Sequence, residues 1–171
     1  MVWRLRFLRR AFVTASVAWF GALPLATLAA TQPHPSTAVY LCSFLVYLAG
    51  SVLCHQLPAR SCFLWGVQMP VCARCTGIYA GAAVTAMVAT IRTLRTRRGG
   101  PVCLPRADTW AGPYETRAAL VLAALPTIVT LVYEWTTGHT PANWIRAAAG
   151  VPIGVVVAWI VCGLRPDAVE G

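Results

Sequence analysis

Long apolar stretches separated by short polar segments dominate this chain. We interpret four of the stretches as membrane-spanning helices, at residues 11–30, 77–91, 118–133 and 144–164. The first runs for twenty residues without a charge. Because about twenty helical residues rise ~30 Å, such a stretch matches the hydrocarbon core of a bilayer. The pattern therefore predicts an all-α polytopic membrane bundle of four spans.

A fifth apolar segment, at residues 38–53, is short for a span. The distribution of arginine separates the two topologies, because cytoplasmic loops carry an excess of basic residues. With four spans, eleven of the fourteen arginines lie on the side of the N-terminus. With five spans, the arginines divide equally between the two sides. The count favours four spans, with 38–53 re-entrant or at the interface, and five spans remain the alternative.

The same count predicts an orientation in the cell membrane. The segment 54–77 is expected outside the cytoplasm and the segment 92–117 inside it. The latter holds six arginines, a Gly-Gly pair and a Gly-Pro pair without hydrophobic periodicity, so we interpret it as a loop.

The chain divides into a basic N-terminus with the first span, a membrane domain and a short tail, at residues 1–37, 38–164 and 165–171. Four arginines within residues 1–10, followed by an apolar run, also fit a signal peptide. The run at 11–30 is long for the apolar region of such a peptide, so we interpret it as a retained span.

The composition agrees with a membrane location. Only 11% of the residues are charged and 58% are apolar, whereas soluble domains carry about 25% charged residues. The net charge of +9 comes from arginine alone, and the bias toward Arg and Ala is typical of a GC-rich bacterial genome. Since the arginines flank apolar segments, the expected partner is the lipid bilayer and not nucleic acid.

The chemistry concentrates in the segment 54–77, which holds four of the seven cysteines. Cys72 and Cys75 form a CxxC pair, whose spacing lets both sulfurs bind one metal ion or form a disulfide. Cys54 and His55 lie upstream, and three thiolates with one imidazole would complete a tetrahedral zinc site. Iron is the less favoured ion. Cys62 is an alternative fourth ligand, with His55 then behind the first coordination shell.

Two other functions remain open for these cysteines. Arg74, between the two thiols, and the helix N-terminus expected at Thr76 both favour thiolates, which would support metal binding and redox exchange alike. A thiol–disulfide oxidoreductase would use the CxxC pair with Cys54 as the resolving thiol. A non-catalytic assembly subunit would use the cysteines only as a structural disulfide. Neither a catalytic triad nor a phosphate-binding glycine loop is present, so the sequence assigns no enzymatic reaction.

Glu134 ends the third span and Arg146 begins the fourth, so the two can pair across a short turn. If this turn and the cysteine segment share one membrane face, Glu134 and Arg60 would form a polar cluster beside the metal site. Ionisable residues at a membrane edge can be functional. The residues expected around the metal in this way are Gln56, Arg60, Cys62, Arg74, Glu134 and Arg146.

The run CHQLPARS, the link QMPV and the run CARCTGIYAG resemble the domain-of-unknown-function 2085 family of small prokaryotic membrane proteins. The later run NWIRAAAGVPIG is similar to the last helix of that family. The resemblance covers roughly Leu53 to Gly163, and Cys62 departs from it. It implies a membrane architecture and a central role for the cysteine segment. The family name implies no activity.

Overall fold

The computed structural model describes residues 2–97 and 113–163. Its helices are α1 (Val2–Ala30), α2 (Thr37–Leu53), the 3-10 turn η1 (Pro58–Arg60), α3 (Ala73–Arg97), α4 (Pro113–Thr137) and α5 (Asn143–Gly163). In this part of the chain, α1, α3, α4 and α5 are long and apolar enough to cross a membrane. The predicted all-α bundle with four candidate spans is therefore confirmed.

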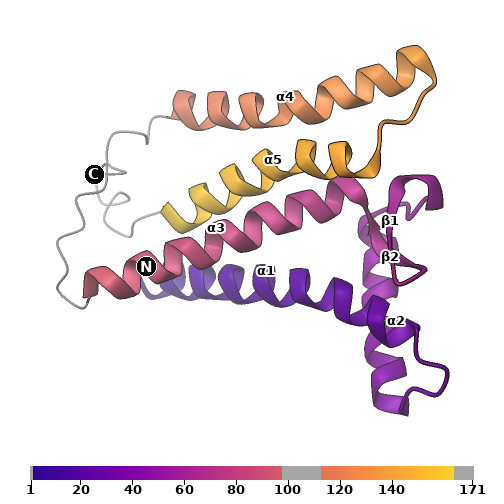
Figure 1. Cartoon of the computed structure of the whole chain (residues 1–171). Helices are drawn as coiled ribbons and strands as arrows, with labels where there is room; N and C mark the ends of the chain where they lie inside the picture. Colours follow the sequence, from indigo (N-terminus) through magenta and orange to yellow (C-terminus); the bar gives the residue numbers. More distant parts are fainter. Residues whose placement is uncertain (1, 98–112, 164–171) are drawn as a thin grey trace.

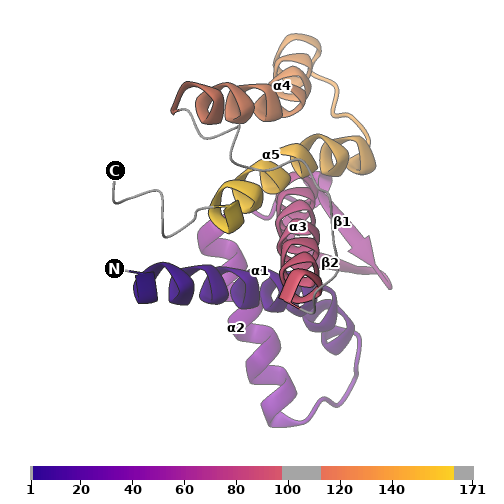
Figure 2. The same ribbon diagram turned by 90° about the vertical axis from the view of Figure 1, so that its left-hand side faces the viewer.

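The four long helices lie side by side in the order α4, α5, α3, α1, from top to bottom of Figure 1. Helix α2 lies at the end of α1 and runs roughly perpendicular to it (Figures 1 and 2). It has 17 residues, and exposed leucine and phenylalanine side chains cover much of its surface. A short apolar helix in this direction suits the membrane interface better than a fifth span.

Helices α3 and α5 approach closely because each carries two glycines four residues apart. A Cβ added at Gly77 would overlap the carbonyl oxygen of Ala147, and one at Gly154 would overlap that of Ile78. Likewise, a Cβ added at Gly81 would overlap the backbone of α5, and one added at Gly150 would overlap the backbone of α3. Small residues at this spacing allow helix backbones to meet in a membrane, where dispersion and not the hydrophobic effect drives association.

A two-stranded antiparallel hairpin, β1 (Ser61–Leu64) and β2 (Val67–Cys72), precedes α3. Its turn places Trp65 and Gly66 at φ of 52° and 79°, and a two-residue turn with positive φ suits the right-handed twist of a hairpin. The sequence did not predict this hairpin, because the strands are short and Pro70 interrupts the second one. The hairpin matters because β2 leads directly into α3 and so places Cys72 at the start of that helix.

Several predicted boundaries were wrong by one turn or more. Helix α3 begins at Ala73, so Thr76 is not an N-cap but lies in the first turn, where its Oγ1 donates to the carbonyl of Cys72 at 3.2 Å. The predicted loop 92–117 is helical at both ends, and α4 continues beyond Glu134 to Thr137. Hydropathy marks only the apolar part of a helix, whereas its backbone hydrogen bonds continue into the polar interface. Cys103, most of that loop and the tail 165–171 lie outside the described residues.

Candidate metal centre

Three cysteines from three elements meet at the hairpin end of the bundle. Cys54 caps the C-terminus of α2, Cys72 ends β2, and Cys75 lies in the first turn of α3. Their sulfur atoms all lie within 4.8 Å of one another. Sulfurs bound to one zinc ion at about 2.3 Å lie roughly 3.8 Å apart, so little movement would let the three bind a single ion. The structure thus brings together three of the four predicted ligands.

The loop after α2 is fastened so that Cys54 stays close to Cys72. The Gln56 side-chain amide donates to the carbonyls of Tyr47 at 3.0 Å and Pro70 at 2.6 Å. In return, the Gln68 amide donates to the carbonyl of Gln56 at 2.6 Å. A Cβ at Gly50 would overlap the carbonyl oxygen of Pro70, so α2 can approach β2 only because this residue is glycine. Gln56, expected near the metal, therefore acts by positioning the chain that carries Cys54.

Hydrogen bonds are also donated to the sulfur atoms of Cys54 and Cys72. The backbone N–H of Cys72 donates to the Sγ atom of Cys54 at 3.2 Å. The pKa of Cys72 is lowered to about 5, chiefly by a hydrogen bond from the Cys75 thiol, with smaller contributions from Cys54 and from backbone N–H groups. Burial opposes this shift. A thiolate is the form of cysteine that binds metals and attacks disulfides.

The two residues predicted as the fourth ligand do not belong to the group of three sulfurs. His55 is exposed, although it contributes to the same cavity as the cysteines. Cys62 is half-buried and packs against the core cluster that contains Met69 and Val71. Burial raises the pKa of the Cys62 thiol, as does the negative charge of Cys72. The assignment of a fourth ligand remains a prediction.

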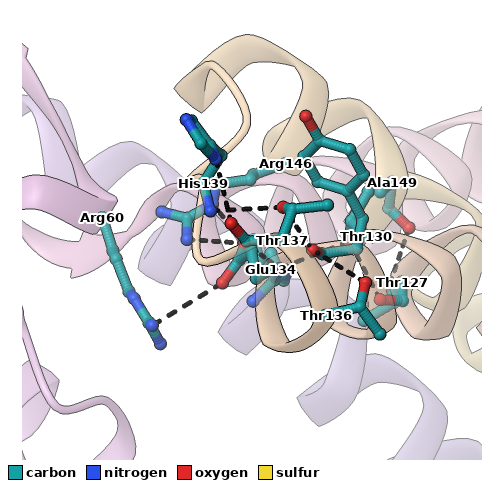
Figure 3. A network of polar contacts seen from close by, with 11 residues as sticks. Arg60, Thr127, Thr130, Glu134, Thr136, Thr137, His139, Arg146 and Ala149 are labelled. Atoms are coloured by element: carbon teal, nitrogen blue, oxygen red, sulfur yellow. Dashed lines mark hydrogen bonds and ion pairs between the residues drawn. The ribbon is translucent and has the colours of Figure 1, made fainter.

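Glu134 joins four elements through three arginines, and Figure 3 shows two of them, Arg60 and Arg146, beside it. Its Oε1 atom accepts hydrogen bonds from Arg146 Nε at 2.8 Å and Nη2 at 2.6 Å, and from Arg74 Nη2 at 2.5 Å. Arg60 approaches the other carboxylate oxygen at 3.6 Å. Glu134 and Arg146 are only 6% and 1% exposed. Residues from η1, α3, α4 and α5, which are far apart in sequence, therefore form one buried ionic cluster.

Sequence reasoning missed one residue that supports this cluster, Thr130. Arg74 Nη2 donates a hydrogen bond to the hydroxyl of Thr130 at 3.3 Å. Thr130 lies one turn before Glu134 on the same face of α4. The Asn143 side-chain amide donates to the carbonyl of Ser61 at 2.9 Å and joins the start of α5 to the hairpin. The spacing of four residues between Thr130 and Glu134 was a signal that could have identified the threonine.

The cysteines and the arginines share one cavity of about 370 Å³. Its lining includes Cys54, Cys72, Cys75, Arg60, Arg74 and Arg146. The expected polar cluster thus lies directly beside the three sulfurs, at the end of the bundle that also carries α2 and the hairpin (Figure 1). A ligand in this cavity would meet both thiol and guanidinium groups.

A family model described as "Predicted membrane protein (DUF2085)" matches residues 54–160. The chain belongs to the DUF2085 family. The matched DUF2085 segment begins at Cys54 and contains all three clustered cysteines together with Glu134 and its three arginines. No solved structure matches the chain.

Two curated relatives come from archaea, and both are named as uncharacterized proteins. The chain is 50% identical to the protein of Methanocaldococcus jannaschii over 46 residues, which cover 27% of this chain and 28% of that protein. It is 29% identical to the protein of Methanothermobacter thermautotrophicus over 109 residues, which cover 62% of this chain and 81% of that protein. The chain thus spans well under half of the first relative and most of the second.

Proposed function

We propose that this DUF2085 protein is a multi-pass membrane protein that binds one metal ion, zinc in preference to iron, through Cys54, Cys72 and Cys75. The observation that carries the proposal is the convergence of three sulfurs from α2, β2 and α3 within 4.8 Å. Thiolates select borderline and soft cations such as zinc over magnesium or calcium. The proposed location of the site is the extracytoplasmic face, as the arginine distribution favours.

The site has features of an exchangeable centre as well as a structural one. Three protein ligands beside a cavity resemble the arrangement in which a fourth coordination position stays open to a small molecule. His55 lines the same cavity and is the protein residue best placed to close that position. With His55 bound, the ion would be structural and would hold α2, the hairpin and α3 together. With His55 free, the ion would be accessible for transfer.

The alternative function is that of a membrane thiol–disulfide oxidoreductase. A third thiol within 4.8 Å of a CxxC pair favours it, because Cys54 could resolve a mixed disulfide. Formation of the Cys72–Cys75 disulfide releases two electrons and two protons, and a membrane quinone would be the acceptor. In a third role, as a structural subunit, the protein would use the cysteines only for a structural disulfide.

Elemental analysis of the full chain, purified in detergent under reducing conditions, tests the proposal. We expect about one zinc per chain in the wild type, loss of the metal in Cys72→Ser and full retention in Cys42→Ser. Cys42 is a suitable control because it is an exposed, free cysteine of α2 outside the three-sulfur group. A metal-free wild type, with Cys72 and Cys75 linked by a disulfide in a parallel preparation made without reductant, would replace the metal proposal with the redox one.

A further inference from the structure

The cavity beside the sulfurs contains more positive charge than its only acidic neighbour among the described residues can balance. Arg60, Arg74 and Arg146 all contribute to its lining, and one carboxylate, that of Glu134, pairs with all three. Three thiolates holding a divalent ion would add a single negative charge, so the cavity would still be positive with a metal bound. A buried positive excess next to a cavity attracts anions strongly, because the surrounding dielectric is low.

Two of these guanidinium groups have buried N–H groups without a partner. Arg146 is 1% exposed, and its Nη1 atom has no hydrogen-bond acceptor. The Nε atom of Arg74 is also buried without an acceptor. Buried polar groups are almost always hydrogen-bonded in native proteins, and those of a charged group are the most costly to leave unpaired. The unpaired donors therefore point to an acceptor that enters the cavity.

Arg60 differs from the other two arginines in its freedom to move. Its side chain is 40% exposed, and it reaches Glu134 only at 3.6 Å, beyond hydrogen-bond distance. Leu53 and Leu57, which also contribute to the cavity, are exposed apolar residues at its edge. The cavity thus has a fixed cationic wall, one adjustable guanidinium group and an apolar rim.

We infer that this cavity is a binding site for a phosphate-type oxyanion, held by Arg146, Arg74 and Arg60 beside the three sulfurs. Planar guanidinium groups match the geometry of phosphate oxygens and form paired, charge-assisted hydrogen bonds with them. The volume of about 370 Å³ is sufficient for a phosphate group with a small substituent. The anion comes either from free phosphate or from the headgroup of an anionic phospholipid, whose chains the apolar rim would accommodate. Either source uses the same arginines, and neither requires a bound metal.

Binding measurements on the full-length protein in neutral detergent test this inference. Calorimetric titration with inorganic phosphate measures binding of the free anion. For the headgroup, the protein is reconstituted into phosphatidylcholine nanodiscs with and without phosphatidylglycerol, and the lipid that it retains is measured. Arg60→Gln is the test variant, because Arg60 is the most exposed and most weakly paired of the three arginines. Arg10→Gln is the matched control, because it removes one charge from an exposed residue in the N-terminal part of α1. That part of α1 lies at the opposite end of the bundle (Figure 1).

We expect Arg60→Gln to weaken phosphate or phosphatidylglycerol binding by about tenfold or more and Arg10→Gln to leave it unchanged. Saturable binding of inorganic phosphate would identify the free anion as the ligand. Retention of phosphatidylglycerol without phosphate binding would identify the headgroup. The inference is overturned if the wild type binds neither, or if both variants lose binding equally. Repeating the titration with Cys72→Ser separates this site from the metal centre, because the anion should still bind when the metal is lost.

Discussion

Replacing Glu134 by glutamine should destabilise the protein severely, because the substitution keeps the shape of the side chain and removes its charge. The Oε1 atom of Glu134 accepts three hydrogen bonds from Arg146 and Arg74. Both side chains of the Glu134–Arg146 pair are almost fully buried, with 3% and 1% exposed. The pair is shielded from solvent, and without the carboxylate the guanidinium groups would lose the charge that compensates them.

The expected cost is about 3–5 kcal/mol, the usual penalty for removing one partner of a buried ion pair. Arg60 adds little to this figure, because its side chain is 40% exposed and its interaction with Glu134 is screened by solvent. For a chain of this size, each kcal/mol corresponds to a change of about 2–4 °C in Tm, so Tm should fall by roughly 6–20 °C. Thermal unfolding in detergent, followed by intrinsic tryptophan fluorescence, measures the change.

The matched control is Glu115→Gln, which removes an exposed carboxylate from the first turn of the same helix. Its effect should stay within about 0.5 kcal/mol, as for most surface substitutions. Adding Arg146→Met to Glu134→Gln should recover part of the loss, since one uncompensated charge is then removed. A Tm for Glu134→Gln within 2 °C of the control variant would refute the reasoning, because the carboxylate would then not be compensating buried charge.

Three further substitutions or insertions test the fold, the site and the topology. Gly154→Ala should lower the free energy of unfolding by about 1–3 kcal/mol, because it forces α3 and α5 apart. Gly21 has open space around it, so Gly21→Ala should be neutral or stabilising, and thermal unfolding compares the two variants. Gly50→Ala should reduce bound zinc without altering a ligand, because it displaces the chain before Cys54; unchanged metal content would contradict that account. A protease site inserted after Gly66, at the hairpin turn, should be cleaved from outside intact cells, and cleavage only after lysis would reverse the proposed orientation.

The positions of the spans could be predicted from sequence because the length of an apolar run is a local property. A run at 11–30 must form helix in lipid, where every backbone polar group needs an internal partner. Helix ends were predicted poorly, since arginine and threonine residues beyond the lipid extend α3 and α4 without any hydrophobic signal.

The composition of the candidate site depended on distances that a sequence does not contain. The CxxC spacing predicted that Cys72 and Cys75 lie together, but Cys54 joins them only because Gln56 and Gly50 hold α2 against β2. His55 is adjacent to Cys54 in sequence, yet it is exposed, because consecutive residues of an extended segment point in different directions.

The sequence by itself therefore determined a four-span membrane bundle and the residue types available at one of its ends. Only the tertiary structure decided that Glu134 pairs with three arginines from η1, α3 and α5, and that they share a cavity with three sulfurs. The physical reason is that hydrophobic runs act through local transfer into lipid, whereas the site is set by how the ends of separate helices pack together.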